Sequence, residues 1–391
     1  MASKIFTRKN LLYFLFIFVF TIVCLEIAGR FYLTKILEKS TDQKFQFNSY
    51  RIYAHVPNFH EGKDGRDWIV INGEGFRRTT EVTKEKPKDT FRVFLMGGSA
   101  AHGISSGPPY PVRHIYPDET IDAYLEKRLR ASYPGKNIEI INAAVTGYVV
   151  NQHTAYIMEE LLNYHPDMFI FFDGANDHIA LNPDYDYYDD NRYQFWKLRL
   201  QQPSLTGMMD YFVLWLTKYS AFAKGFYAWR LNKDADKNIA LSYLRKPAKT
   251  NEELISNYKA ASQKQYLRSV EININMLNNF GIKSLVIFQP ILVLRKQDNL
   301  SATEKPLLTT DPVAKKLYPY IISDLTRVTS KFNVPFVDMN ITFDNDTLKG
   351  KELFIDYVHL SPLGGEVVAN RIYPIIDSIC GAYFSVKDTI R

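Results

Sequence analysis

The sequence contains few of the residues that build disulfide frameworks or metal centres. Only two of its 391 residues are cysteines, Cys24 and Cys380, and they belong to separate parts of the chain. A disulfide framework is therefore not expected. No Cys-x-x-Cys motif or cluster of cysteine and histidine is present, so the sequence predicts neither a zinc site nor another metal site, and no cofactor.

Long basic blocks and internal repeats are also missing. The chain has 48 lysine and arginine residues against 42 acidic ones, a net charge of +6. This balance favours a mildly basic, solvated surface and excludes nucleic acid as an expected partner. No Gly-x-Gly-x-x-Gly motif follows the first predicted strand, so dinucleotide binding is not indicated. A hydrophobic fraction of 46% in a chain of this length is enough for one large domain or two smaller ones.

An uncharged apolar run occupies residues 11–25, close to the N-terminus. Lys4, Arg8 and Lys9 precede it, which predicts that the N-terminus stays cytoplasmic while the rest of the chain crosses the membrane. At ~1.5 Å per residue the run spans roughly 22 Å, and snorkelling side chains extend it toward the ~30 Å hydrocarbon core. We therefore predict an uncleaved signal anchor, a transmembrane helix within residues 1–33. A cleaved signal peptide is the alternative, although the run lacks the small-residue pattern that cleavage requires.

Beyond the anchor, a mixed polar segment precedes a long region of alternating patterns. We interpret residues 34–90 as a linker and pre-domain segment, and residues 91–391 as one domain with a helical, aromatic-rich insertion at about 180–253. Short apolar runs predict strands at 91–96, 138–141, 168–172, 284–288 and 334–337, with helical patterns between them. This alternation predicts an α/β fold with a mostly parallel five-stranded sheet covered by helices on both faces.

Four short motifs lie next to these predicted elements. They are Gly-Gly-Ser at 97–99, Gly147, Gly-Ala-Asn-Asp at 174–177, and Asp-Tyr-Val-His at 356–359. Three follow predicted strands and the fourth precedes the last predicted helix. Because reactive groups gather outside the carboxyl ends of parallel strands, we expect the four motifs to converge.

The residue types in these motifs match those of serine-dependent acyl transfer. Ser99 offers a hydroxyl nucleophile, His359 can take its proton, and Asp356 can orient the imidazole. The backbone N–H groups of Ser99 and Gly147 and the side-chain amide of Asn176 can donate to a developing oxyanion. Each motif alone is also an ordinary turn. Together they indicate a serine hydrolase or an acyltransferase of the same chemistry.

The order Ser, Gly, Asn and Asp-x-x-His resembles the SGNH hydrolase superfamily, also called GDSL-like hydrolases, over residues 91–380. The resemblance implies that the five residues just named are the triad and oxyanion hole of that family. It also implies a three-layer α/β/α sandwich of the flavodoxin-like type. The first block of the family is often Gly-Asp-Ser, whereas Gly98 replaces the acid here. Residues 72–77 are similar to a segment that precedes the domain in membrane-anchored bacterial members.

Candidate substrate-binding residues follow the third motif. His178 lies two residues beyond Asn176, and Tyr185 and Tyr187 belong to a segment rich in tyrosine and aspartate. Such a segment can stack on and hydrogen-bond a sugar, or it can be a solvated loop with tyrosines packed on the core. Residues 208–231 carry an aromatic stripe that is typical of a lid, of an amphipathic helix on the bilayer, or of core packing.

These patterns lead to one functional hypothesis with two alternatives. The first is a membrane-anchored esterase in the bacterial periplasm or at the cell surface, which hydrolyses O-acyl esters through an acyl-enzyme on Ser99. Acyl groups on cell-envelope or extracellular carbohydrate are the first candidate substrates. The alternatives are an O-acyltransferase that passes the acyl group to a polysaccharide hydroxyl, and a non-catalytic envelope binding or assembly protein. The oligomeric state is not predicted.

Overall fold

The computed structural model describes residues 8–37, 44–48, 50–106, 110–177, 212, 216, 219–223, 225–226, 250–264, 266–308 and 312–389. The chain divides into two compact units, Met1–Lys44 with Asp189–Lys246, and Phe45–Tyr188 with Pro247–Arg391. The polypeptide therefore passes between the two units three times.

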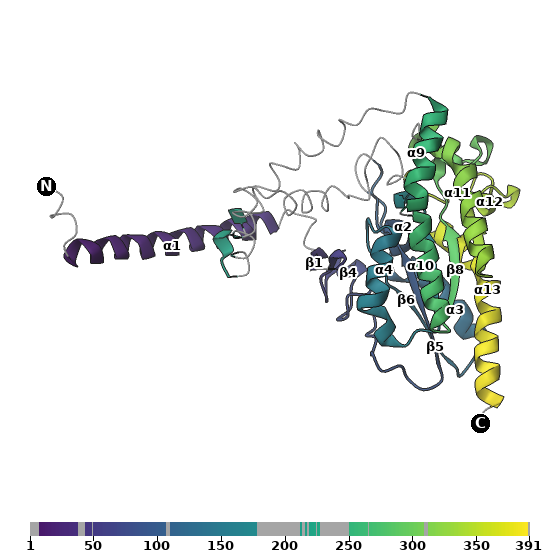
Figure 1. Cartoon of the computed structure of the whole chain (residues 1–391), viewed down its shortest axis with the longest axis horizontal. Coiled ribbons are helices and arrows are strands. Elements are labelled where there is room, and N and C mark those ends of the chain that lie inside the picture. Colours follow the sequence, from purple (N-terminus) through teal and green to yellow (C-terminus); the bar gives the residue numbers. More distant parts are fainter. Residues whose placement is uncertain are drawn as a thin grey trace. The chain divides into compact units, whose positions relative to one another are not determined.

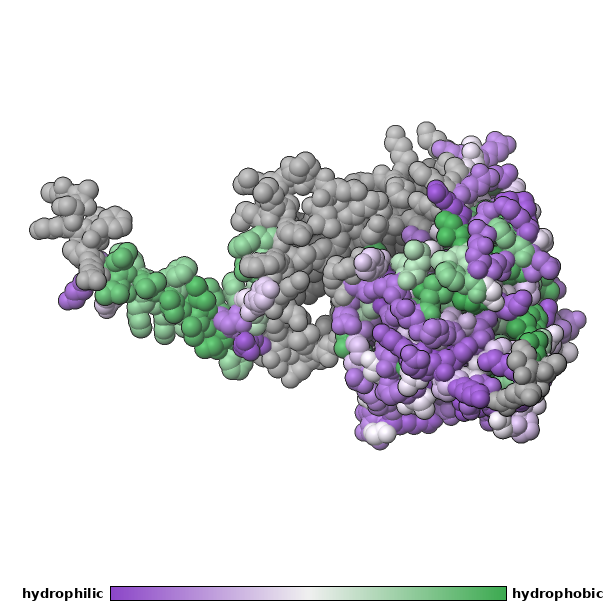
Figure 2. Space-filling model, turned by 60° about the horizontal axis from the view of Figure 1, so that its bottom comes forward, coloured by the Kyte–Doolittle hydropathy of each residue, from purple (hydrophilic) through white to green (hydrophobic). Residues whose placement is uncertain are grey.

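The first unit contains one long apolar helix, α1 (Arg8–Leu37). Within it, Lys9–Phe31 is a stretch of 23 residues with a mean hydropathy of 2.6, and its apolar window is not buried in the protein. At ~1.5 Å per residue this stretch is roughly 35 Å long, enough to cross the ~30 Å hydrocarbon core. The prediction of an N-terminal apolar helix of membrane-spanning length is confirmed, and Figure 2 shows its hydrophobic surface as a green band.

The second unit is built around a parallel sheet of five strands in the order β6-β5-β7-β8-β9. The strands are β5 (Thr90–Gly97), β6 (Asn137–Asn142), β7 (Met168–Asp173), β8 (Lys283–Phe288) and β9 (Phe336–Asp338). Every neighbouring pair is parallel. The predicted α/β fold with a five-stranded sheet is confirmed. Strands β5 and β7 are buried along their whole length because helices cover both faces of the sheet.

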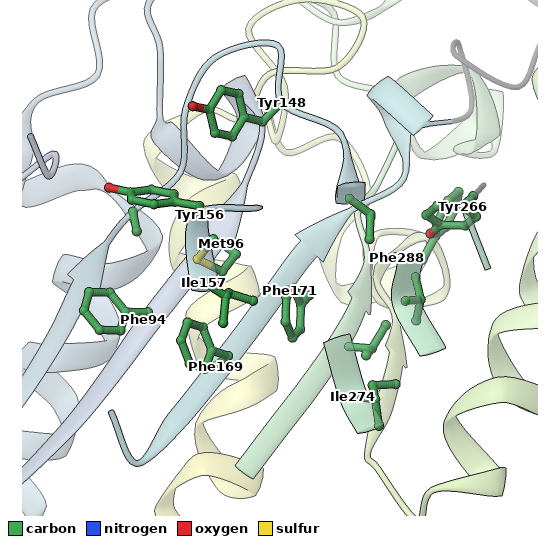
Figure 3. Close-up of a cluster of buried hydrophobic side chains, with 14 of the residues drawn as sticks. Phe94, Met96, Tyr148, Tyr156, Ile157, Phe169, Phe171, Tyr266, Ile274 and Phe288 are labelled. Carbon is green, nitrogen blue, oxygen red and sulfur yellow. The ribbon is translucent and has the colours of Figure 1, made fainter. Parts of the chain in front are cut away.

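The two faces of the sheet pack against different helices, which makes a three-layer α/β/α sandwich (Figure 1). Val93 and Leu95 point to one face, whereas Phe94 and Met96 point to the other. Figure 3 shows the second face, where Phe169 packs beside Phe94 and Met96. The first face is covered by α3 (Ile121–Ser132), α12 (Met339–Phe343) and α13 (Pro362–Thr389), and the second by α4 (Val150–Glu159), α9 (Asn251–Lys264), α10 (Tyr266–Asn279) and α11 (Pro312–Lys331).

Shorter elements complete the second unit. Two antiparallel hairpins precede the sheet, and they consist of β1 (Phe45–Asn48) with β2 (Ile52–His55) and β3 (His60–Lys63) with β4 (Arg66–Val70). Short 3-10 helices lie at Pro117–Glu119, Leu161–Tyr164, Leu292–Leu294, Gln297–Asn299, Lys305–Leu307 and Asp346–Leu348. The chain after β4 reaches the core, because the fully buried ring of Phe76 lies 5.5 Å from Phe94 and 5.3 Å from Tyr164 between ring centroids.

Candidate active site

Ser99 stands at the sharp turn where β5 ends. It is the first residue of the short helix α2 (Ser99–His102), and Gly98 is the N-cap. The backbone N–H of His102 donates to the Gly98 carbonyl at 3.0 Å, and the N–H of Gly103 donates to the Ser99 carbonyl at 3.0 Å. The turn therefore holds a half-buried hydroxyl at the carboxyl end of the sheet, where the sequence placed the first motif.

His359 and Asp356 lie in a tight loop immediately before α13. One Asp356 oxygen accepts the backbone N–H groups of Val358 at 2.9 Å and His359 at 2.7 Å. The other oxygen lies 2.6 Å from His359 Nδ1. On the far side of the ring, Nε2 lies 2.7 Å from the Ser99 hydroxyl oxygen, across 260 positions of sequence. The structure therefore brings the first and fourth motifs together.

The charge state of Asp356 fixes the protonation of the histidine ring. Burial alone would raise the pKa of Asp356, but hydrogen bonds from the His359 ring and from two backbone N–H groups outweigh burial and lower it. The carboxylate form is thus stabilised, and it requires a proton on Nδ1 of His359. In the neutral ring Nε2 then carries the lone pair that accepts the Ser99 O–H.

Asn176 approaches Ser99 from the end of β7. Its side-chain Nδ2 donates to the Tyr148 carbonyl at 2.9 Å, which uses one of the two N–H bonds of the amide. A Cβ atom added to Gly98 would lie 2.3 Å from this Nδ2. A side chain at position 98 would therefore force the Asn176 amide to move.

Gly147 lies on the loop after β6. Its φ of +82° is in the left-handed region that favours glycine, and an added Cβ would meet the Tyr53 hydroxyl at 2.7 Å. That hydroxyl donates to the Thr146 carbonyl at 2.8 Å and fixes the loop. Among the described residues, none accepts a hydrogen bond from the backbone N–H of Ser99 or Gly147.

Two tyrosines that the sequence reasoning missed lie in this region, one beside the histidine and the other beside the first tyrosine. The ring of Tyr357 lies 6.4 Å from the His359 ring, and Tyr110 lies 6.2 Å from Tyr357, between centroids. Burial and the Asp356 carboxylate raise the pKa of Tyr110. The position of Tyr357 inside the fourth motif was an available signal, whereas no pattern pointed to Tyr110. The predicted substrate-binding residues His178, Tyr185 and Tyr187 lie outside the described residues.

A cluster of buried ionisable residues holds both ends of the segment at residues 174–176, which contains Asn176. His153 of α4 lies with Nδ1 3.2 Å from an Asp173 carboxylate oxygen at the end of β7. Burial lowers the pKa of His153, but the two carboxylates of Asp173 and Asp177 raise it by more. Asp177 accepts the backbone N–H of Val150 at 3.0 Å. Burial and the Asp173 charge raise the pKa of Asp177 to about 7. Both residues that flank the Gly-Ala-Asn segment are thus held by α4.

The segment at residues 72–77 also has a structural role that the sequence did not explain. The Asn72 side chain closes a turn by accepting the N–H groups of Glu74 at 3.2 Å and Phe76 at 2.9 Å. The turn delivers Arg77 into the protein, where burial lowers its pKa to about 10. One guanidinium nitrogen donates to the carbonyls of three separate segments, Trp68, Gly103 and Ile115, at 3.0 to 3.1 Å. Because Gly103 directly follows α2, Arg77 anchors the turn that begins at Ser99.

Comparisons with known proteins find solved structures of acetyl xylan esterases and of an alpha/beta hydrolase enzyme, all at low similarity. No family model and no curated protein matches the chain. A variant of Axe2, an acetyl xylan esterase from Geobacillus stearothermophilus, shares 15% identity with a TM-score of 0.40, over 73% of this chain and 94% of its own. LAE5, an alpha/beta hydrolase enzyme from the metagenome of Lake Arreo, Spain, shares 12% with a TM-score of 0.41, over 77% and 98%. The acetyl xylan esterase AlAXEase shares 12% with a TM-score of 0.42, over 73% and 100%. At these values the likenesses carry no inference about substrate or mechanism.

Proposed function

We propose that this chain is a membrane-anchored serine esterase of the SGNH type, which hydrolyses O-acyl esters through an acyl-enzyme on Ser99. The observation that carries the proposal is the line of contacts from Asp356 through His359 to Ser99, with distances of 2.6 Å and 2.7 Å. A nucleophile, a base and an orienting carboxylate require this order of contacts.

In the first half of the reaction, the Ser99 oxygen bonds to the ester carbonyl carbon while its proton moves to His359 Nε2. The Asp356 carboxylate stabilises the imidazolium that forms. The N–H groups of Ser99 and Gly147 and the second N–H of Asn176 donate to the oxyanion of the tetrahedral intermediate. The intermediate collapses with cleavage of the ester C–O bond. His359 gives its proton to the leaving alcohol, and the acyl group stays on Ser99.

In the second half, water attacks the acyl-enzyme carbonyl and passes a proton to His359 Nε2. The same three donors hold the oxyanion again. Collapse breaks the bond to Ser99, whose oxygen recovers the proton from His359, and the carboxylic acid leaves. The cycle consumes one water and restores the neutral imidazole, so no group other than the substrate is changed.

The substrate class that we propose is O-acylated carbohydrate of the cell envelope or the extracellular space. Helix α1 supports the membrane side of this proposal, because it is long and apolar enough to span a bilayer. The basic residues Lys4, Arg8 and Lys9, which precede the apolar run at residues 11–25, favour an extracytoplasmic active unit. The half-buried ring of Tyr357 lies beside His359, and the half-buried ring of Tyr110 lies beside Tyr357; both offer flat apolar faces on which a sugar ring can pack.

The test is hydrolysis of a panel of esters by the full-length protein in detergent micelles. The panel contains short- and long-chain aryl esters and acetylated glycans. Replacement Ser99→Ala is expected to lower kcat/KM by at least ~10³-fold because the nucleophile is removed. Ser132→Ala, at an exposed serine at the end of α3, is the matched control and is expected to retain full activity.

Two outcomes would contradict the proposal. No activity of the folded wild type on any ester would favour a non-catalytic binding protein. Equal activity of wild type and Ser99→Ala would refute the acyl-enzyme on Ser99. Product analysis in the presence of a carbohydrate acceptor separates the remaining two classes. Release of free acid supports the esterase, whereas an acylated acceptor with little free acid identifies an O-acyltransferase.

A further inference from the structure

A glutamate inside the apolar helix α1 is hydrogen-bonded to a distant part of the chain. The Glu26 carboxylate accepts the Ser220 hydroxyl at 2.7 Å and the backbone N–H groups of Ala221 at 2.8 Å and Phe222 at 3.1 Å. These two N–H groups lie at the start of the short helical segment described at residues 221–223 and 225–226, and the first N–H groups of a helix have no partner within their own helix. Glu26 therefore caps this segment from a different helix, across 194 to 196 positions of sequence.

Gly29 allows the backbone of α1 to lie close to the backbone of residues 221–222. It lies three residues after Glu26, so both residues share one side of α1. A Cβ added to Gly29 would lie 2.4 Å from Phe222 Cα and 2.9 Å from the Ala221 carbonyl carbon. Gly29 is buried while its neighbours Ala28 and Arg30 are exposed. Small residues allow this backbone-to-backbone packing between membrane helices.

The docked segment carries two exposed aromatic side chains. Phe222 and Phe226 are 39% and 40% exposed, and their rings stack with centroids 6.4 Å apart. Ala223 between them is buried. Exposed apolar surface that continues from an apolar helix marks an interaction surface. Aromatic residues of this kind concentrate at the level where lipid headgroups meet acyl chains.

The position of Glu26 in α1 sets the depth of this surface. Glu26 lies five residues before the end of the apolar stretch Lys9–Phe31, about 7–8 Å along the axis at ~1.5 Å per residue. A carboxylate at that depth is costly unless it is hydrogen-bonded. The three donors of residues 220–222 meet this requirement.

We propose that residues 219–223 and 225–226, docked on α1 through Glu26 and Gly29, form a second membrane-contacting element of this protein. Its partner is the lipid bilayer, at the boundary of headgroups and acyl chains in the leaflet that receives the C-terminal part of α1. The inference rests on the membrane-spanning role of α1 in the proposed function. It adds that α1 has a binding partner within the chain and is retained rather than cleaved.

The element changes how the active unit is attached to the membrane. A simple anchor joins its domain through one linker, whereas here the chain passes between the two units three times. Residues Asp189–Lys246 belong to the same unit as α1, so the chain of the catalytic unit is connected to the proposed membrane-contacting unit at both ends of this stretch.

The test places an environment-sensitive dye on the element in the full-length protein. Phe226→Cys in a Cys24→Ala background is labelled with the fluorophore NBD, and the protein is reconstituted into phosphatidylcholine vesicles. Cys380 is buried and remains unlabelled in the folded protein. We expect a blue-shifted emission and quenching by lipids that are spin-labelled near the headgroup. Glu26→Ala and Gly29→Leu are expected to abolish both signals, whereas Ala28→Leu, on an exposed position of α1, retains them.

The outcomes distinguish failure of this inference from failure of the function. An unquenched dye on a protein that still floats with vesicles would overturn the second element and leave the anchor in place. Quenching that persists in Glu26→Ala and Gly29→Leu would overturn the docking contact. A chain that does not float with vesicles would overturn both the anchor and the element. Hydrolysis of a soluble aryl ester, measured on the same samples, reports separately on folding and on the proposed esterase.

Discussion

The contact between Gly98 and Asn176 yields the most specific prediction about the proposed chemistry. Replacement Gly98→Ala adds a single methyl group next to Ser99 and leaves Ser99, His359 and Asp356 themselves unchanged. The added Cβ would lie 2.3 Å from the Asn176 amide nitrogen and 3.4 Å from the Tyr148 carbonyl to which that nitrogen donates. A carbon and a nitrogen cannot approach so closely, so the amide must leave its position.

The size of the effect follows from the role that we assign to the displaced amide. Removal of one oxyanion donor typically costs ~3–4 kcal/mol of transition-state stabilisation, which is roughly 10²- to 10³-fold in kcat. Because the oxyanion forms only in the transition state, KM is expected to change little. We therefore expect Gly98→Ala to lower kcat by about two to three orders of magnitude in a protein that melts near the wild-type temperature.

A double-mutant cycle separates this mechanism from general damage to the site. If Gly98→Ala acts only through Asn176, the double variant Gly98→Ala with Asn176→Ala should be no slower than Asn176→Ala alone. Steady-state hydrolysis of a soluble aryl ester by all four proteins gives the coupling. Gly365→Ala is the matched control, because an added Cβ there meets its nearest atom at an ordinary 3.4 Å. Wild-type kcat in Gly98→Ala, or fully additive losses in the double variant, would refute the reasoning.

Three further predictions concern charges and buried hydrogen bonds. Asp356→Asn should lower kcat by roughly 10²- to 10⁴-fold in steady-state assays, because a neutral amide no longer stabilises the imidazolium of His359; a loss below tenfold contradicts this role. The pKa of Asp177 is raised to about 7, so its contribution to stability is present at low pH and is lost as the pH rises through 7. Thermal melts of Asp177→Asn should therefore show a gain over wild type at pH 8 that shrinks at pH 5, and an equal difference at both values would argue against it. Arg77→Met leaves three buried carbonyls without their donor and should lower the free energy of unfolding by roughly 2–5 kcal/mol in urea titrations, whereas unchanged unfolding would show that the guanidinium is dispensable.

The sheet could be predicted because its strands are covered on both faces. Such strands read as continuous apolar runs, and the predicted strand at 91–96 corresponds to Thr90–Gly97. The strand order was not predicted, since pairing between distant segments leaves no local pattern. The hairpins between Phe45 and Val70 were also missed, because their strands are only four or five residues long and β3 carries mostly exposed polar residues.

The candidate site was predictable where its residues belong to short sequence motifs. Ser99 and His359 are of residue types that indicate a nucleophile and a base. The parallel sheet then predicts that the two motifs lie close together, because the carboxyl ends of its strands meet at one edge. His153 and Asp173 were not predictable, because their interaction joins α4 to the end of β7 and depends on burial. The contact of Glu26 with residues 220–222 was not predictable either, because no local sequence pattern indicates that these two distant segments pair.

The measurement that most directly tests the account is labelling by a fluorophosphonate, followed by peptide mapping. This reagent reacts with serines that a neighbouring base has activated. The account predicts stoichiometric label on Ser99 in the full-length protein and loss of that label in His359→Ala. An unlabelled Ser99 in the folded protein, or equal labelling with and without the histidine, would contradict it.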